Sequence, residues 1–317
     1  MKKKGILIML IALLLMSFTA CSSLQDQGQA TKKKVYTSIY PIYDFTKKIG
    51  GDKIEIELLT SPGAEPHSFE PSAKDMAKIE KSDLFLYNGL GLDSWAEKIA
   101  QSLSNQGKKA LAVAEIEEIH PMIFTEQDED HHQGQQSHEH GIYDPHVWLD
   151  PMNAEKMGKA IKEQLVRIDS ENKEYYEKNF ITFQKQLKEL DENYQKSLSQ
   201  VEKKDFIVNH AAFGYLANRY GLNQIPITGL VPQAEPSPAK LKELTKLIKE
   251  HDINTIFMES LSSSKLTDVL SEETGVKVEL LHPIGGLTRQ EMDQGKEYLS
   301  LMKQNLQVLT KAFSGKE

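Results

Sequence analysis

Cysteine is almost absent from this 317-residue chain, which has a single one at position 21. One cysteine excludes an internal disulfide and any zinc cluster built on several cysteines. A surplus of basic charge is also missing, because 38 lysines and arginines stand against 46 acidic residues and the formal net charge is −8. Nucleic acid is therefore not an expected partner. Any chemistry with a soft metal must rest on the ten histidines.

A long apolar run is missing as well. The apolar stretch Ile6–Leu15 is too short to span a bilayer comfortably, and it follows three lysines, so residues 1–20 are predicted to be a secretory signal peptide. Two small residues directly before Cys21 resemble the lipobox of bacterial lipoproteins, in which cleavage leaves the cysteine as the lipidated first residue. We expect residues 21–34 to form a lipid anchor and flexible tether on the outer face of the cell membrane. The alternative is ordinary secretion with an incidental cysteine.

Two α/β lobes are predicted from the remaining chain, which is long enough to bury a sizeable core. Short β-rich runs alternate with helical patterns in residues 35–168 and again in 204–317, which indicates βαβ units and mostly parallel sheets. Ser72 is the expected N-cap of the second helix. Strands are expected at 35–40, 54–60, 83–88, 206–209, 224–227, 255–258 and 276–281, and helices at 42–49, 72–81, 211–220, 238–250 and 266–273.

A long helix is predicted between the lobes, within residues 169–203. The segment has an apolar stripe whose members recur every three or four residues: Phe180, Phe183, Leu187, Leu190, Tyr194 and Leu198. The pattern predicts one helix ending near residue 168 and another over 170–200, which would span about 45 Å. A surface coiled coil for dimerisation is the alternative. Because the stripe is confined to one segment, we expect a rigid connector in a monomer.

Three histidines occupy comparable places. His67 follows the first lobe's second strand, within Ala-Glu-Pro-His-Ser-Phe-Glu-Pro; His146 lies within Asp-Pro-His-Val-Trp-Leu-Asp-Pro; His210 is expected between a strand and a helix. Strand ends and helix starts are where open α/β sheets bind ligands. Each histidine alone is more often a capping or core residue, but three in such places favour a shared metal site. Imidazole suits Zn²⁺, and three ligands leave a fourth position for water or a carboxylate.

A second group of histidines lies in a polar segment without apolar residues, at 126–141. We interpret this segment as a loop that binds metal weakly and as an auxiliary to the main site. The alternative is a solvated loop with chance histidines. Its histidines are His131, His132, His138 and His140.

These motifs resemble the solute-binding lipoproteins of bacterial ABC transporters for zinc and manganese, on their zinc branch. The resemblance covers essentially the whole mature sequence, and the Asp-Pro-His-x-Trp-x-Asp-Pro string is its most specific part. Manganese-type relatives carry a carboxylate where His210 stands, and the acidic His-rich loop is typical of zinc members. The motifs are Tyr40-Pro41, the turn around His67, the string 144–151, the segment His210-Ala-Ala-Phe-Gly-Tyr, Phe257-Met-Glu-Ser260 and Pro283-Ile-Gly-Gly-Leu-Thr288.

The resemblance implies two α/β lobes joined by one long helix, with the metal in the cleft between them. It implies that His67, His146 and His210 ligate the ion. The implied function is capture of extracytoplasmic Zn²⁺ and its delivery to a membrane permease, whose ATPase is a separate subunit; no enzyme activity is implied. Because the ligands must be deprotonated, affinity is expected to fall below about pH 6.5.

The fourth ligand and two rival functions stay open. Many relatives place an acidic residue near Pro283–Gly286, where this chain has Gly285, so water, Glu65 or His282 are candidates for the fourth position. A zinc hydrolase is one rival, since three histidines and a water also form catalytic sites. However, the chain has no His-Glu-x-x-His helix, and no evident base stands beside the ligands in the sequence. The other rival is an adhesin with a structural metal.

Overall fold

The computed structural model describes residues 32–124, 142–232, 237–263 and 265–314. From Lys33 on, the chain forms one compact unit. The expected signal peptide and Cys21 lie outside the described residues, and so does the loop 126–141 with its four histidines. Among the helices of the described ranges, none combines the length and apolar character that a membrane span needs.

Four parallel strands form the sheet that precedes the long helix, in the order β2-β1-β3-β4. All four residues of β3 are buried, as expected for an inner strand of a parallel sheet covered on both faces. The strands are β1 (Lys33–Thr37), β2 (Ile54–Leu58), β3 (Leu84–Tyr87) and β4 (Lys109–Ala112), and the helices are α2 (Tyr40–Gly50), α3 (Ala73–Ile79) and α4 (Ser94–Asn105).

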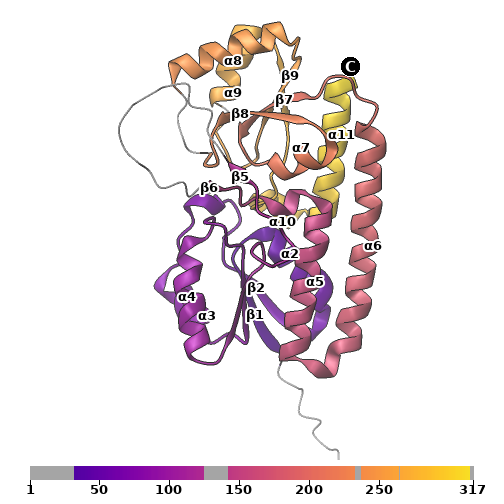
Figure 1. Cartoon of the computed structure of the whole chain (residues 1–317). Coiled ribbons are helices and arrows are strands. Elements are labelled where there is room, and N and C mark those ends of the chain that lie inside the picture. The colour runs from indigo at the N-terminus through magenta and orange to yellow at the C-terminus, as the bar shows by residue number, and fades with distance from the viewer. Residues whose placement is uncertain (1–31, 125–141, 233–236, 264, 315–317) are drawn as a thin grey trace, which may run out of the picture. The chain divides into compact units, whose positions relative to one another are not determined.

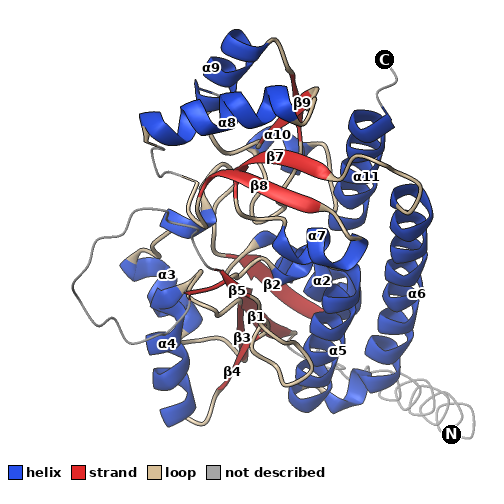
Figure 2. Ribbon diagram, turned by 45° about the horizontal axis from the view of Figure 1, so that its top comes forward, coloured by secondary structure: helices blue, strands red, loops and turns tan. Residues whose placement is uncertain are grey.

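A second parallel sheet follows the long helix, in the order β10-β9-β7-β8. Counted along the chain within each sheet, both place their strands as 2-1-3-4, so the two sheets share one topology. Figure 2 shows this order in the first sheet, as β2, β1, β3 and β4. The strands are β7 (Asp205–His210), β8 (Asn223–Thr228), β9 (Thr255–Met258) and β10 (Lys277–Leu280), and the helices are α7 (Gly214–Tyr220), α8 (Pro238–Glu250), α9 (Lys265–Thr274), α10 (Arg289–Asp293) and α11 (Tyr298–Ser314).

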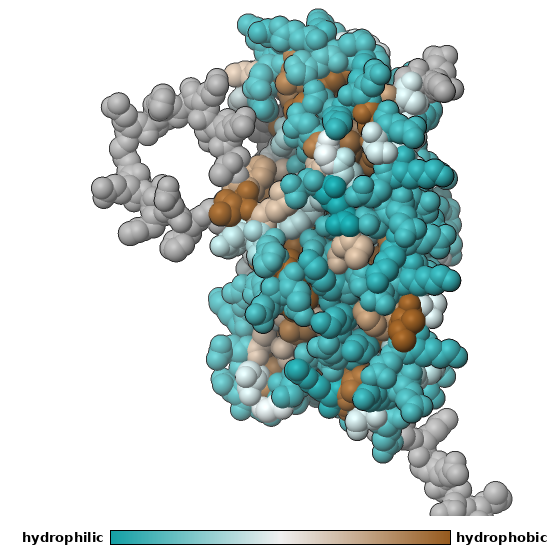
Figure 3. All heavy atoms as spheres, turned by 45° about the vertical axis from the view of Figure 1, so that its right-hand side comes forward, coloured by the Kyte–Doolittle hydropathy of each residue, from teal (hydrophilic) through white to brown (hydrophobic). Residues whose placement is uncertain are grey.

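Two helices connect the sheets, α5 (Pro151–Ile168) and α6 (Lys173–Leu198). We call the part of the chain before α6 the N-terminal lobe and the part after it the C-terminal lobe. Helix α6 packs against α2 and α5 of the first lobe and α11 of the second, and Figure 1 shows it running beside both. All six residues of its predicted apolar stripe are buried, while the surface on this side is mostly hydrophilic (Figure 3). The stripe therefore packs within the chain and is not available as a dimer seam.

Several boundaries differ from the sequence-based expectation. The regular part of α6 starts at Lys173, because residues Ser170–Asn172 form a 3₁₀ turn first. Helix α7 starts at Gly214 and not at Ala211, because the strand before it continues through His210, which is paired with Thr228 of β8. The short antiparallel pair β5 (Ile123–Phe124) and β6 (Ile142–Tyr143) was not predicted, and neither were α4, β4, α10 and α11.

Candidate metal centre

His67 is placed by a 3₁₀ turn, Pro66–Ser68, in the long connection after β2. Proline at the first position suits such a turn because its ring already fixes φ. Glu65 precedes the turn, and its Oε1 accepts the backbone N–H of His67 at 3.3 Å. The imidazole remains partly exposed. The local sequence therefore explains the turn that carries His67.

His146 lies between β6 and α5 and is 1% exposed. Oδ1 of Asp144 accepts the backbone N–H of His146 at 2.9 Å and lies 2.8 Å from its Nδ1. Further along the same string, Nε1 of Trp148 donates to the carbonyl oxygen of Pro283 at 2.8 Å. Asp150 then caps α5 by accepting the N–H of Met152. The Asp-Pro-His-Val-Trp-Leu-Asp-Pro string thus holds the histidine, contacts the C-terminal lobe and begins a helix.

His210 is the last residue of β7 and is 2% exposed. Its Nδ1 lies 2.7 Å from Oε1 of Glu259, which also accepts the backbone N–H of His210 at 3.1 Å. Glu259 directly follows β9, the neighbour of β7 in the sheet. Parallel neighbouring strands bring their carboxyl ends to one edge, which explains why residues 49 positions apart meet here.

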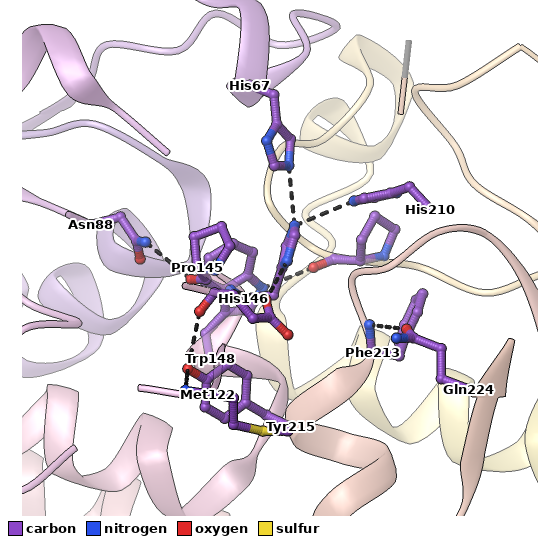
Figure 4. A network of polar contacts seen from close by, with 12 residues as sticks. His67, Asn88, Met122, Pro145, His146, Trp148, His210, Phe213, Tyr215 and Gln224 are labelled. Atoms are coloured by element: carbon purple, nitrogen blue, oxygen red, sulfur yellow. Dashed lines mark hydrogen bonds and ion pairs between the residues drawn. The ribbon is translucent and has the colours of Figure 1, made fainter. Parts of the chain in front are cut away.

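The three imidazoles converge on one point (Figure 4). Nε2 of His146 lies 3.1 Å from Nε2 of His67 and 3.3 Å from Nε2 of His210. Nitrogen ligands at about 2.0–2.1 Å from a tetrahedral Zn²⁺ are about 3.3–3.4 Å apart, so this spacing fits one ion. Among the described residues, these three form the one group of histidine, cysteine or acidic side chains whose ligand atoms lie mutually within 4.8 Å. The structure therefore brings together the three histidines singled out in the sequence.

A cavity of about 20 Å³ opens in front of the imidazoles and is also lined by Glu65, Leu92 and Leu261. This volume is room for about one water molecule. Gly285 closes one side: a Cβ there would lie 3.3 Å from Cγ of Pro66 and 3.6 Å from Cζ2 of Trp148. No side chain reaches the cavity from the position where many relatives carry an acid.

His282 does not join the group. Its Nδ1 accepts the N–H of Ile284 at 2.9 Å, and its Nε2 lies 3.0 Å from Oγ of Ser260 and 3.2 Å from Oε1 of Glu291. Both ring nitrogens are therefore engaged in a separate buried network. Of the three candidates for the fourth position, water and Glu65 remain.

The sequence profile of the family described as zinc-uptake complex component A periplasmic (ZnuA) matches residues 35–312. This chain belongs to the ZnuA family. The high-affinity zinc uptake system protein ZnuA of Bacillus subtilis (strain 168) is 42% identical to it over 313 residues, which is 98% of each chain.

Two further similarities extend this ZnuA relationship. The zinc-binding lipoprotein AdcA of Streptococcus pneumoniae (strain ATCC BAA-255 / R6) is 40% identical over 308 residues, and this chain spans 60% of its length. The solved structure of the Zn(II)-bound ZnuA-like domain of Streptococcus pneumoniae AdcA is 37% identical, with a TM-score of 0.75 over 89% of this chain and 99% of that one. The fold is thus that of an extracytoplasmic solute-binding protein, and the family is not one of enzymes.

Two imidazoles of this ZnuA-family site are neutral at physiological pH. Burial, followed by the charges of the other two histidines, lowers the pKa of His67 to about 2. Burial also lowers the pKa of His146 well below its usual value. Because a neutral imidazole keeps a lone pair for a metal ion, both rings are ready to act as ligands.

A carboxyl group lies at Nδ1 of two of the rings, Asp144 at His146 and Glu259 at His210. Burial lowers the pKa of His210, but the carboxylates of Glu259, Glu65 and Asp144, with Glu259 foremost, together outweigh burial and leave that pKa raised. Burial raises the pKa of Asp144 to about 7. A cation at Nε2 favours an ionised acceptor at Nδ1 and a deprotonated imidazole, so metal binding at this site is coupled to proton release.

Sequence reasoning missed the roles of Asp144 and Glu259, although both stand in the motifs that it singled out. A base was sought beside the ligands in the sequence, and these two carboxylates were not assigned as partners of the imidazoles. Both carboxylates contact Nδ1, on the side of each ring away from the converging Nε2 atoms. They orient the rings and raise their basicity, and they do not face the cavity as a general base would. Asp144 could have been found in the sequence from its position two residues before His146. Glu259 could have been assigned only once the order of the strands in the sheet was known.

Proposed function

We propose that this chain captures Zn²⁺ through His67, His146 and His210 and delivers it to the membrane permease of an ABC transporter. The observation that carries the proposal is the spacing of the three Nε2 atoms, at 3.1 and 3.3 Å, which fits the edges of one tetrahedral zinc site. The zinc uptake and zinc-binding functions named for the similar proteins support the same reading.

Zinc is favoured over manganese by the chemistry of the donors. Three imidazole nitrogens suit Zn²⁺, whereas Mn²⁺ prefers oxygen ligands. Among the described residues, Glu65 is the one acidic side chain lining the cavity, and burial raises the pKa of its carboxyl group. In this proposal the fourth position holds either water or Glu65.

Delivery requires a site that can be loaded and emptied. The ligands come from both lobes, so a relative displacement of the lobes separates His210 from the other two and weakens the site. The permease is the proposed partner, and a monomer is the proposed form that docks on it. We further propose that Cys21 anchors the mature protein to the outer face of the membrane. The His-rich loop at 126–141 is proposed as an auxiliary collector of zinc.

The other two functions considered from the sequence receive less support. A hydrolase does not fit a family of solute-binding proteins. An adhesin role remains a prediction, and no contact among the described residues specifies a polymer surface.

Metal titration tests the proposal. Metal-free protein is titrated with Zn²⁺ and Mn²⁺ at neutral pH against a competing chelator, alongside His67→Ala, His146→Ala and His210→Ala. Each variant is expected to lose the tight zinc equivalent, with a fall in affinity of about 10²–10³-fold, since a four-ligand zinc site provides about 10–16 kcal/mol. His251→Ala is the matched control, because His251 is half-exposed and pairs with Asp205. Loss of tight binding in only one of the three variants would contradict the shared site.

A further inference from the structure

The orientation of His146 depends on a group that the opposite lobe contacts. Asp144 is 4% exposed and fixes both the backbone and Nδ1 of His146 through one carboxylate oxygen, Oδ1. A displacement of Asp144 would therefore turn or shift the imidazole. The contacts that hold Asp144 therefore determine how well His146 is oriented.

Tyr215, in α7 of the C-terminal lobe, is one such contact. Its hydroxyl donates to the backbone carbonyl of Asp144 at 3.0 Å and accepts the N–H of Met122 at 2.9 Å. The N–H of Asp144 in turn donates to the carbonyl of Met122 at 2.9 Å. The three residues form a closed ring of hydrogen bonds across the lobes. Figure 4 shows Met122 and Tyr215 near His146.

Gly214 is the second residue that bounds Asp144. Its backbone lies so close to the Asp144 carboxylate that there is no room for a side chain. A Cβ at this position would lie 2.6 Å from Oδ2 of Asp144, which is closer than real Cβ contacts allow. The backbone of Gly214 does not have a positive φ, so its conformation does not demand glycine. The neighbouring carboxylate does, because any side chain here would displace it.

The same short segment also carries a ligand. His210 stands four residues before Gly214, and between them Phe213 is fixed by its N–H, which donates to Oε1 of Gln224 at 2.6 Å. Residues 210–215 of the C-terminal lobe thus include the ligand His210 and also contact Asp144, the residue that orients His146 in the other lobe.

We propose that Gly214 and Tyr215 are positioning residues for zinc binding: from the C-terminal lobe they hold Asp144, and through it they set the direction of His146. The site is then assembled by contact between the lobes as well as by its ligands. This inference rests on the proposed role of His146 as a zinc ligand.

The test compares Tyr215→Phe and Gly214→Ala with Tyr220→Phe in the full chain. Tyr220 lies on the same helix, is similarly buried, and donates its hydroxyl to Asp191 at 2.8 Å, away from Asp144. Zinc affinity is measured by chelator competition, and visible absorption of the Co²⁺-loaded protein reports the ligand arrangement. Thermal unfolding of each metal-free variant gives the effect on stability alone.

Tyr215→Phe is expected to bind zinc about tenfold more weakly, as for one lost hydrogen bond. Gly214→Ala is expected to bind about 10–100-fold more weakly, as for a displaced outer partner of a ligand. Both should alter the Co²⁺ spectrum, and Tyr220→Phe should alter neither measurement.

Three results would contradict the proposal or its basis. If Tyr215→Phe and Gly214→Ala match Tyr220→Phe in affinity and spectrum, α7 does not position His146. If all three variants weaken zinc binding in proportion to their thermal destabilisation, the role of α7 is structural only. If the unsubstituted protein binds no tight zinc equivalent, the proposed function itself fails, and the inference falls with it.

Discussion

The two lobes share one strand order but hold their histidines in different ways. In the C-terminal lobe, His210 ends a strand, and its acceptor Glu259 follows the neighbouring strand. In the N-terminal lobe, His67 and His146 both come from connections outside the sheet. The C-terminal ligand is therefore fixed by the sheet itself, whereas the N-terminal ligands must be fixed by local groups.

The local groups of the N-terminal lobe are unequal. His146 has Asp144 two residues away, while the ring of His67 has no carboxylate partner among the described residues. The comparison indicates that one topology can present ligands either rigidly from a strand end or adjustably from a loop. A site that must both bind and release an ion combines the two.

Helix α6 is the element on which both lobes depend, and breaking it should have the largest effect. Leu187 is completely buried in the stripe that faces both lobes. Leu187→Ala is expected to lower the free energy of unfolding by about 2–5 kcal/mol, through lost burial and a cavity. Ile181→Ala, at a position 61% exposed on the same helix, should change it by less than about 0.5 kcal/mol. Denaturant unfolding of both variants checks this, and equal effects would contradict the assigned orientation of α6.

Substituting the carboxylates of Asp144 and Glu259 compares the histidine at a strand end with the histidine in a loop. Asp144→Asn and Glu259→Gln are each expected to weaken zinc binding by about 10–100-fold, as outer partners of ligating histidines do. The matched control is Asp205→Asn, which alters a similar pair, with His251 Nδ1 at 2.7 Å, in an exposed place. Chelator competition measures all three. An unchanged affinity in Glu259→Gln would show that the strand fixes His210 without help from its acceptor.

The pH dependence of zinc affinity should distinguish the histidine of the C-terminal lobe from those of the N-terminal lobe. A proton on His210 competes with zinc, and because the pKa of this residue is raised above 6.5, affinity should begin to fall at a pH above 6.5. In Glu259→Gln the main influence that raises the pKa of His210 is lost and burial remains, so the fall in affinity should move to lower pH. Zinc titrations between about pH 5.5 and 8, around the ordinary histidine pKa, measure this shift. The same onset in both proteins would contradict the assigned role of Glu259.

The protonation of His210 should also change the stability of the metal-free protein with pH. Because the pKa of His210 is raised on folding, its contribution is fully present below the unfolded pKa of about 6.5. That contribution is lost as the pH rises through the folded pKa. Thermal unfolding of the metal-free protein against Glu259→Gln should therefore differ more at pH 6 than at pH 8.

The smallest effect is expected from the His-rich loop. Deleting residues 126–141 should remove weak zinc equivalents and leave the tight one unchanged, since that segment is proposed as an auxiliary. Calorimetric titration of the deletion variant counts both classes. Loss of the tight equivalent would mean that the loop supplies a ligand to the main site.

Much of the fold was predictable because its signals are local. Ser72 caps α3 as predicted, through a box with Asp75 in which each side chain accepts a backbone N–H. The apolar stripe of α6 follows from helical periodicity alone. The start of α7 was not predictable in this way, because whether His210 belongs to a strand depends on its pairing with Thr228.

The site residues were likewise predictable only where their sequence signals are local. Proline and histidine motifs pointed to His67, His146 and His210, and the predicted strand ends suggested that they meet. Glu259 and Gly214 could not be assigned from the sequence, because each acts on a residue of another element. The contact of Gly214 with Asp144 joins positions 70 residues apart, and only the arrangement of the two lobes brings them together.

Anomalous diffraction at the zinc edge, from crystals of the zinc-loaded protein, tests whether both lobes bind one ion. We expect one strong peak about 2.0–2.1 Å from Nε2 of all three histidines, and so bound by both lobes. A principal peak that contacts the histidines of one lobe only would contradict it.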